Sequence, residues 1–156
     1  MPVLTLVIGL SASGKSTLLQ GYIRAGIPVF DDFMKGSPEG FPNCEHLGQM
    51  RRHIAAGRDL VLADICLVRP AFRKEVLHQL AAADYRVNHI CFKNDPRQCI
   101  KNSRTRADRQ RADHESEKKS IPKFSSEYVI PHGAEVIDVV DARHYQAGSR
   151  LTSKDF

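Results

Sequence analysis

The sequence predicts an α/β domain in which a five-stranded parallel sheet lies between helices, as a three-layer αβα sandwich. Three observations lead to this fold class. Short apolar runs rich in β-branched residues alternate with helical patterns along the chain. These runs are nearly continuous in their apolar character, which is typical of parallel strands covered on both faces. The first run is followed at once by a glycine-rich turn and a helix, Gly9 onward, which is typical of a phosphate-binding α/β domain.

The first half of the chain divides at its glycines and prolines. We expect a strand over 3–8, a helix over 15–25 that ends at Gly26, and a short strand over 28–30. A loop rich in glycine and proline follows over 31–42. The pattern then predicts a helix over 43–56 that ends at Gly57, and a buried strand over 59–63.

The second half repeats the alternation. Pro70 is placed to open a helix that reaches about residue 83 and carries one apolar face, which contains Phe72, Val76, Leu77 and Leu80. A fourth strand is expected over 86–92, and Asp95-Pro96 reads as the cap and first turn of a helix through about residue 109. Residues 113–133 are polar and are expected to be irregular, before a fifth strand over 136–140.

Length and composition limit the possible classes of protein. The chain has 156 residues, which suits one domain. Hydrophobic residues make up 42% and charged residues 26%, which excludes a disordered tail, a collagen-like rod and a disulfide mini-scaffold. The net charge of +5 favours an anionic partner without choosing between nucleotide, nucleic acid and membrane surface.

The compartment is predicted from the N-terminus and the cysteines. The run that begins Pro2-Val3-Leu4 is too short for a membrane helix and lacks the basic leader of a signal peptide. The four cysteines form neither a C-x-x-C pair nor a zinc spacing with the histidines. We therefore expect reduced, structural thiols in a cytoplasmic protein that has no membrane partner and no zinc site.

The motif G-x-x-x-x-G-K-S carries the functional prediction. It occupies Gly9–Ser16, between a predicted strand and a predicted helix, which is the context that the motif requires. Its glycines allow successive N–H groups to turn toward a phosphate, and the helix that follows points its positive end at the same anion. Lys15 is expected to bridge the β- and γ-phosphates and Ser16 to bind Mg²⁺. The expected ATP-binding residues are Gly9, Ser11, Ala12, Ser13, Gly14, Lys15, Ser16 and Thr17.

Carboxylates follow two of the predicted strands. Asp31 and Asp32 come after the second strand, and Asp64 after the third. Because ligands of parallel sheets bind beyond the carboxyl ends of the strands, these groups should face the phosphate site. Asp31 or Asp32 is therefore a candidate general base for an acceptor hydroxyl, and Asp64 is a candidate Mg²⁺ ligand in a Walker-B strand. Asp32, Lys35 and Asp64 are expected on the acceptor side.

A basic segment follows the fourth strand. The window 97–112 contains six basic residues and one acid, so it accounts for the whole net charge. A charged helix face is ordinarily solvated. After the fourth strand of a phosphate-loop kinase, however, arginines of a lid neutralise the phosphoryl group in transfer. Arg104 and Arg106 are the candidates here. We expect a kinase domain over 1–142, with a lid at about 97–120, and a polar tail over 143–156.

Taken together, these motifs resemble the polynucleotide-kinase branch of the P-loop kinases. The resemblance rests on the loop at 9–16, on Asp31-Asp32-Phe33, on the strand that ends in Asp64, and on Lys101-Asn102-Ser103-Arg104-Thr105-Arg106. It implies a kinase-type P-loop fold, with Asp31 as general base and Lys15 and an arginine among 104–106 as clamps on the γ-phosphate.

The sequence departs from that branch on the acceptor side. Phe30 precedes the aspartate pair where the family commonly has a basic residue, and Met34 stands where an arginine often follows the pair. A small phage relative of this branch, which phosphorylates the hydroxymethyl group of 5-hydroxymethyluracil within DNA, resembles this chain in having one kinase domain, an altered acceptor loop and a basic lid. This resemblance gives the sharpest prediction for the acceptor.

Other functions remain open from the sequence. The acceptor could be the 5′-hydroxyl of a polynucleotide or a small metabolite, as in kinases of the shikimate or gluconate type. A non-catalytic nucleotide-binding switch or an ATPase is a third class. The sequence decides neither between ATP and GTP nor the oligomeric state.

Overall fold

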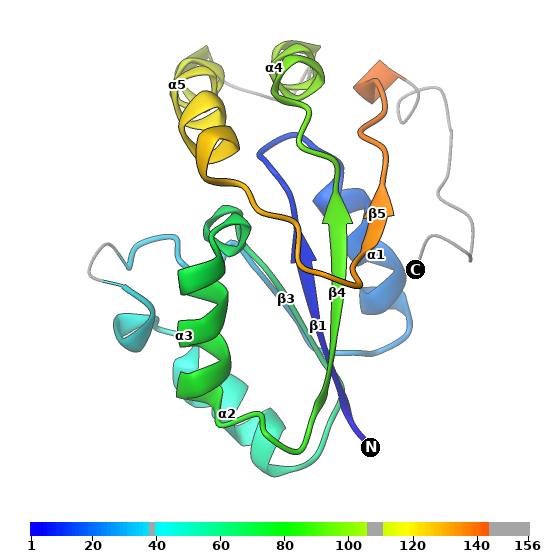
Figure 1. Cartoon of the computed structure of the whole chain (residues 1–156), viewed down its shortest axis with the longest axis vertical. Coiled ribbons are helices and arrows are strands. Elements are labelled where there is room, and N and C mark those ends of the chain that lie inside the picture. The colour runs from blue at the N-terminus through cyan, green and yellow to red at the C-terminus, as the bar shows by residue number, and fades with distance from the viewer. Residues whose placement is uncertain (38–39, 106–110, 144–156) are drawn as a thin grey trace.

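Five parallel strands form the sheet, in the order β2-β3-β1-β4-β5 (Figure 1). The computed structural model describes residues 1–37, 40–105 and 111–143 of the chain. The strands are β1 (Val3–Ile8), β2 (Val29–Asp31), β3 (Leu60–Ala63), β4 (Arg86–Phe92) and β5 (Glu135–Ile137). β1 is central and pairs with both β3 and β4. The predicted parallel αβα fold is confirmed.

Five helices connect or cover the strands. They are α1 (Lys15–Arg24), α2 (Leu47–Ala55), α3 (Pro70–Leu80), α4 (Pro96–Thr105) and α5 (Arg111–Glu127), with short 3₁₀ turns η1 (Phe41–Asn43) and η2 (Ile65–Val68). The helix expected over 43–56 is divided, since η1 and a short link precede α2. The strand expected over 136–140 is shorter, as β5 ends at Ile137. The tail from 144 onward lies outside the described residues.

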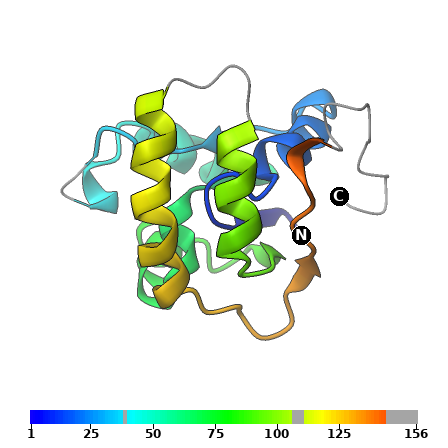
Figure 2. The same ribbon diagram turned by 90° about the horizontal axis from the view of Figure 1, so that it is seen from above.

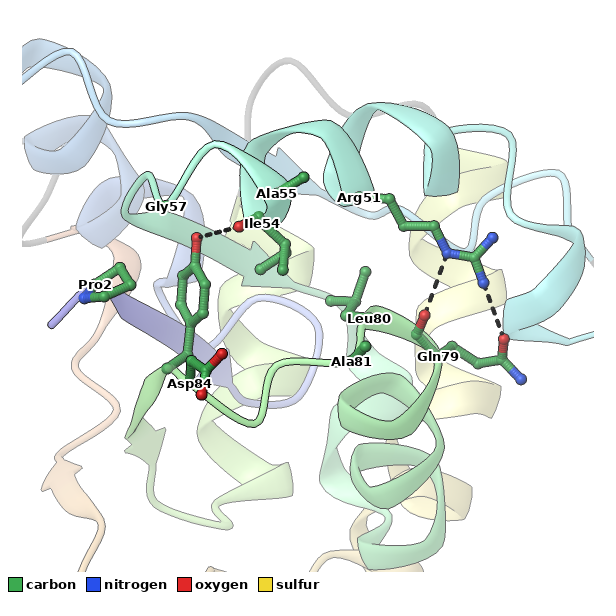
Figure 3. A pocket seen from close by; sticks show the side chains of 10 residues that line it. Pro2, Arg51, Ile54, Ala55, Gly57, Gln79, Leu80, Ala81 and Asp84 are labelled. Atoms are coloured by element: carbon green, nitrogen blue, oxygen red, sulfur yellow. Dashed lines mark hydrogen bonds between the residues drawn. The ribbon is translucent and has the colours of Figure 1, made fainter.

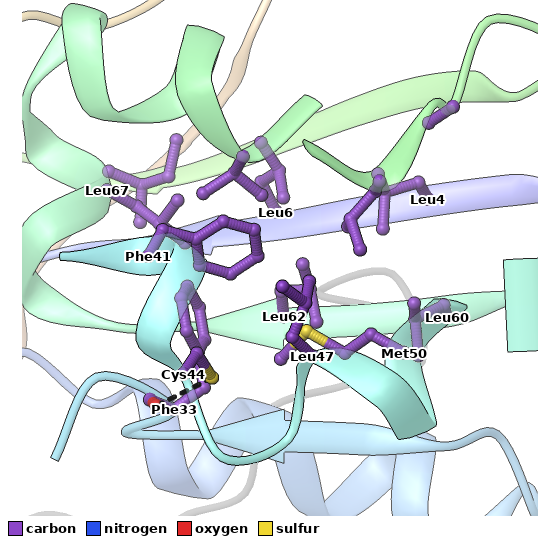
Figure 4. Close-up of a cluster of buried hydrophobic side chains, with 14 of the residues drawn as sticks. Leu4, Leu6, Phe33, Phe41, Cys44, Leu47, Met50, Leu60, Leu62 and Leu67 are labelled. Atoms are coloured by element: carbon purple, nitrogen blue, oxygen red, sulfur yellow. Dashed lines mark hydrogen bonds between the residues drawn. The ribbon is translucent and has the colours of Figure 1, made fainter. Parts of the chain in front are cut away.

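The two faces of the sheet bury separate apolar clusters. Leu6 and Leu62 point to the face that α2 and α3 cover, where Met50 and Val76 meet them. Figure 4 shows that cluster, in which the Cys44 thiol also donates to the carbonyl of Phe33 at 3.2 Å. The opposite face packs on α1: Leu18 and Leu19 belong to a cluster with Val7, Val61, Ala63, Ile90 and Phe92. Burial on both faces explains the continuous apolar strands.

The prediction of an irregular segment over 113–133 is wrong, because α5 occupies Arg111–Glu127. The expectation rested on the polar composition of the segment. Pro122 lies inside the helix and removes one backbone donor. The helix is stabilised by an apolar seam instead. Ile121 is fully buried, and Phe124 and Tyr128 pack beside it at spacings of three and seven residues.

The helices α4 and α5 lie side by side across the carboxyl ends of the strands (Figure 2). The hydroxyl of Ser103 in α4 and Nδ1 of His114 in α5 are 2.9 Å apart. The other end of α5 is tied to η2 by an ion pair between Arg69 and Glu127. Among the described residues, no helix is both long enough and apolar enough to cross a bilayer.

Candidate active site

The loop between β1 and α1 has the shape of a phosphate cradle. Gly14 has φ 114°, a left-handed conformation that favours glycine, and it stands directly before α1. Gly9 does not have a positive φ, so the prediction that it serves through unusual backbone angles is wrong. A Cβ on Gly9 would lie 2.6 Å from Ser13 Oγ and 3.2 Å from the Cβ of Phe92. Gly9 is thus required for space.

Two further residues of the loop are energetically unfavourable, one in its backbone conformation and one in its hydrogen bonding. Ala12 has φ 63°, which is unusual for a residue with a Cβ. The hydroxyl of Ser13 is buried and has no hydrogen-bond partner among the described residues. A buried hydroxyl without a partner is destabilising. Strain and an unsatisfied donor in one loop are typical of a site prepared for a ligand.

Lys15 bonds to the backbone of the phosphate-binding loop. Its ammonium donates to the carbonyl oxygens of Gly9 at 2.8 Å and Leu10 at 2.9 Å. Burial lowers the pKa of Lys15, and the negative charges of Asp31, Asp32 and Asp64 oppose that shift. The predicted lysine and the three predicted carboxylates therefore lie in one electrostatic environment. Ser16, at the start of α1, is exposed, and Thr17 is partly exposed.

The aspartate pair lies at the carboxyl end of β2, which extends one residue further than the predicted strand and includes Asp31. Asp31 is the last residue of β2 and is in register with Ala63. Burial and the charge of Asp32 raise the pKa of Asp31, and Lys15 lowers it in part. Asp32 has φ 50°, and its N–H donates to the carbonyl of Ala63 at 2.8 Å. The chain thus turns sharply at Asp32, where it leaves the sheet.

Asp64 joins two loops at this edge of the sheet. Its side chain is 3% exposed. Oδ2 accepts from the N–H of Met34 at 2.9 Å and Oδ1 from the N–H of Cys66 at 2.8 Å. The residue that the sequence singles out as a metal ligand is therefore also an anchor for the loop after β2 and for η2.

A cleft of about 490 Å³ adjoins these groups. It is lined by Asp32, Met34, Lys35, Asp64, Ile65, Cys66, Ser116 and Glu117. All three residues predicted for the acceptor side, Asp32, Lys35 and Asp64, therefore lie in one cleft. Burial is the main reason that the pKa of the Cys66 thiol rises to about 12. The thiol therefore adds no charge to the cleft at neutral pH.

The basic helix lies above the site. α4 exposes Arg97, Lys101 and Arg104, which share one face at spacings of four and three residues, and the helix contains no acid. Arg104 is in the last turn of α4. Arg106 lies outside the described residues, so its predicted role as a clamp has no structural account.

A second cleft, of about 570 Å³, is lined by a different set of residues (Figure 3). It is formed where α2 and α3 end and β1 begins, and its lining includes Pro2, Ile54, Leu80 and Tyr85. The hydroxyl of Tyr85 donates there to the carbonyl of Arg58 at 2.7 Å. Because ligands bind at the carboxyl ends of parallel strands, this cleft is at the wrong end of the sheet for catalysis.

Comparisons with known proteins bear on the fold. No family model and no curated protein sequence matches the chain. A gluconokinase from Sinorhizobium meliloti 1021 superposes with a TM-score of 0.57 at 15% identity, over 94% of this chain and 91% of that one. The APS kinase CysC of Mycobacterium tuberculosis, solved with AMPPNP and APS, gives 0.53 at 16% identity, over 94% of both chains.

A chain of the Pnkp1/Rnl/Hen1 RNA repair complex gives a TM-score of 0.52 at 14% identity, over 86% of this chain and 49% of that one. At such identities the likeness concerns the fold alone. Together with the strand order and the phosphate-binding loop, it shows that the chain has the P-loop NTPase fold of the kinase type.

Sequence reasoning missed two residues of the site: Ser116 and Glu117 reach the cleft from α5, which was expected to be irregular. Tyr128 and Asn102 belong to segments that carry the family resemblance, but their contacts could not be read from the sequence. Tyr128 donates to the carbonyl of Phe92 at 2.5 Å and to that of Ile8 at 3.3 Å, at the two strand ends beside the loop. Asn102 bonds to the loop itself. The seam formed by Ile121, Phe124 and Tyr128 was the signal for α5.

Proposed function

We propose that this protein is a kinase that transfers the γ-phosphate of ATP to a hydroxyl group of an acceptor. The observation that carries the proposal is the placement of Lys15 in the phosphate-binding loop under the influence of Asp31 and Asp32. A cradle alone serves nucleotide binding, whereas a carboxylate beside it provides a base for transfer. The likeness in fold to a gluconokinase and an APS kinase supports the same class of reaction.

Lys15 and Ser13 are the proposed contacts to the phosphates. In the ligand-free loop the ammonium of Lys15 is occupied by the carbonyls of Gly9 and Leu10. When ATP binds, the ammonium exchanges these carbonyls for β- and γ-phosphate oxygens, and the bond is stronger because the acceptor is charged. The buried hydroxyl of Ser13 gains a partner at the same time. The remaining loop donors are backbone N–H groups at the start of α1.

Asp31 is the proposed general base. As the acceptor oxygen bonds to the γ-phosphorus, its proton passes to the Asp31 carboxylate, and the bond between that phosphorus and the β–γ bridging oxygen breaks. The products are the phosphorylated acceptor and ADP. The raised pKa of Asp31 makes it a stronger base than an ordinary aspartate. Asp32 and Lys35, from the cleft wall, orient the acceptor.

The lid is proposed to span about residues 97–120, which includes α4 and the first part of α5. Arg104, exposed at the end of α4, and Arg106 are its proposed clamps on the γ-phosphate. Their guanidinium groups would stabilise the negative charge that develops on the phosphoryl group during transfer.

Ser16 and Asp64 are the proposed Mg²⁺ ligands. Their donor set fits this ion, because Mg²⁺ takes oxygen ligands and Ser16 presents an exposed hydroxyl at the start of α1. Each carboxylate oxygen of Asp64 accepts one backbone N–H and keeps a second lone pair. When bound, Mg²⁺ supplies positive charge that polarises the phosphate oxygens.

The hydroxymethyl group of 5-hydroxymethyluracil in DNA is the proposed acceptor. Two basic surfaces support a polyanionic partner. α4 exposes Arg97, Lys101 and Arg104 on one face. The other basic surface is a cleft of about 780 Å³, formed by α2 and the turn after it. Its lining contains Arg52, His53 and Arg58 and no acidic residue. Contacts to phosphates on such surfaces position nucleic acid independently of its sequence.

The acceptor cleft supports a second candidate. Asp32, Asp64 and Glu117 line it against one cation, Lys35. Carboxylates accept hydrogen bonds from hydroxyl groups, and Lys35 can pair with an acceptor's own carboxylate, so a small polyhydroxylated acceptor of the shikimate or gluconate type also fits. A 5′-hydroxyl polynucleotide end is a third acceptor that would place its phosphates on α4 and its reacting hydroxyl in the cleft.

Transfer of label from [γ-³²P]ATP tests the function. The acceptors are duplex DNA containing 5-hydroxymethyluracil, 5′-hydroxyl oligonucleotides, free nucleosides and small polyols. The proposed activity predicts label on the hydroxymethylated duplex, with loss of transfer in Asp31→Asn and ATP affinity within about twofold of wild type. Label only on polyols would move the function to a small-metabolite kinase. Release of phosphate without labelled acceptor would identify an ATPase.

A further inference from the structure

The side chain of Asn102, in α4, uses the full hydrogen-bonding capacity of an amide. Nδ2 donates to the carbonyl oxygens of Ala12 at 3.1 Å and Val140 at 2.8 Å. Oδ1 accepts from the Nε2 of Gln98 at 2.9 Å and from the N–H of Ala142 at 2.8 Å. The residue is 1% exposed. A buried amide with two donors and two acceptor sites satisfied is a rigid joint.

This joint holds the phosphate-binding loop at its strained point. Ala12, whose carbonyl accepts from Asn102, is the residue with φ 63°. Such a conformation persists only where surrounding contacts impose it. The bond from Asn102 is one of those contacts, and it comes from a residue 90 positions away in the chain.

The other segment of the joint, 140–142, lies on the side proposed for the nucleoside. The acceptor groups Asp31 and Asp64 follow β2 and β3, on one side of β1. The phosphate-binding loop follows β1 itself, so the rest of a nucleotide must extend to the other side, over the ends of β4 and β5. Val140 and Ala142 belong to the segment that follows β5.

We propose that Asn102 is a positioning residue that couples the phosphate cradle to the nucleoside side of the ATP site. Its side chain forms hydrogen bonds both to the carbonyl of the strained Ala12 and to the segment 140–142, so that ordering of either segment orders the other. This inference rests on the proposed nucleotide site and adds to it a specific communication between its two halves. Binding of the phosphates and binding of the nucleoside are then cooperative.

Amide hydrogen exchange of the wild-type protein gives the first test. Inorganic tripolyphosphate occupies the phosphate cradle and has no nucleoside. If Asn102 couples the two halves, tripolyphosphate slows exchange of the Ala142 amide by about threefold or more, since that amide is bonded to Asn102. Unchanged exchange at Ala142, with tripolyphosphate bound, would overturn the proposal.

Substitution gives the second test. The dissociation constants of ATP and tripolyphosphate are measured by calorimetry for Asn102→Ala and Asn102→Asp. Each loses the donors to Ala12 and Val140, and we expect the preference for ATP over tripolyphosphate to fall by about tenfold. A structural role alone would weaken both ligands equally and leave the ratio unchanged. Asn102→Asp preserves the shape of the side chain if Asn102→Ala does not fold.

Gln98→Leu is the matched control. It removes one bond to Asn102 but leaves the bonds to Ala12, Val140 and Ala142 in place, and its ratio should stay within about twofold of wild type. The failure of the proposed function has a different signature: the wild-type protein would bind neither ATP nor tripolyphosphate. A ratio that falls equally in Gln98→Leu and Asn102→Ala would contradict the role of Asn102.

Discussion

The carboxylate of Asp64 accepts a hydrogen bond from the backbone N–H of Met34 at 2.9 Å. This contact joins the end of β3 to the loop that follows β2, and so it joins the candidate metal ligand to the wall of the acceptor cleft. The geometry of this loop therefore depends on one buried side chain.

Asp64→Asn is expected to lower the free energy of unfolding by about 2 kcal/mol, because the amide must present a donor to one of two backbone N–H groups. Acceptor KM should rise as the loop loosens. Urea denaturation and steady-state kinetics measure the two effects. Asp59→Asn is the matched control: Asp59 accepts from the N–H of Val3 at 2.8 Å at an exposed site far from the cleft. Equal kinetic effects of both variants would contradict the role of Asp64.

The loop between β1 and α1 gives a second prediction. Ser13→Ala removes a buried hydroxyl that has no partner in the described structure, and it should raise the free energy of unfolding by about 1 kcal/mol without ligand. ATP affinity should fall, since the same hydroxyl is a proposed phosphate donor.

Gly9→Ala should destabilise the protein, and Gly9→Ala/Ser13→Ala should regain part of that loss because the closest contact, at 2.6 Å, is gone. Denaturation and calorimetry test this; a destabilising Ser13→Ala would contradict it.

The pH dependence of transfer follows from Asp31. Burial and Asp32 raise the pKa of Asp31, and a general base must be ionised. The acid limb of kcat/KM should therefore lie at a higher pH than for an ordinary aspartate. Asp32→Asn removes one cause of the shift and should move the limb to lower pH, while Asp31→Asn removes transfer. A limb that stays in place in Asp32→Asn would show that another group is the base.

The same raised pKa sets a stability prediction. The folded protein binds the Asp31 proton more tightly than the unfolded chain does, so this group favours folding at low pH and loses that contribution as the pH rises through the pKa of the folded state. At neutral pH the ionised Asp31 is thus unfavourable for folding. Asp31→Asn should raise the midpoint of thermal unfolding at pH 7 and leave it nearly unchanged at pH 3. A lower midpoint at pH 7 would contradict this reasoning.

Salt dependence tests the nucleic-acid partner. If the exposed face of α4 contacts phosphates, replacing Arg97, Lys101 and Arg104 by glutamine should reduce the slope of log K for DNA against log salt by about two to three. Fluorescence anisotropy over a salt series gives the slopes. Lys74→Gln, at an exposed position of α3, is the control and should leave the slope unchanged. A small slope for the wild-type protein itself would favour a small-metabolite acceptor.

The local signals in the sequence were enough for the sheet and the cradle. The apolar runs predicted β1 and β4 at their observed bounds, and the glycine-lysine-serine motif located the start of α1. The carboxylates Asp31, Asp32 and Asp64 were placed correctly at strand ends because parallel topology alone brings such ends together. Their roles in the reaction stay predictions.

Tertiary contacts explain what the sequence did not reveal. The polar composition of 113–133 concealed α5, which is stabilised by packing of Ile121 and Phe124 rather than by helix propensity. The reason for Gly9 was likewise hidden, since the limiting distance is to the side chain of Ser13 in the folded loop. The four bonds of Asn102 join segments that are distant in sequence, and no local pattern encodes them.

The strand order has a consequence for how this protein can diverge. The groups proposed to meet the acceptor come from β2, β3 and α5, whereas the joint around Asn102 belongs to the β1, β4 and β5 half. Exchange of residues 31–37 for the equivalent loop of a kinase with another specificity would leave the nucleotide half untouched. The exchanged loop must keep the proposed base at position 31, a buried side chain at position 33 and a backbone N–H at position 34 for Asp64. The residues proposed to select the acceptor can thus be exchanged as one loop. The segments that Asn102 joins must instead change together, because they bond to the same side chain.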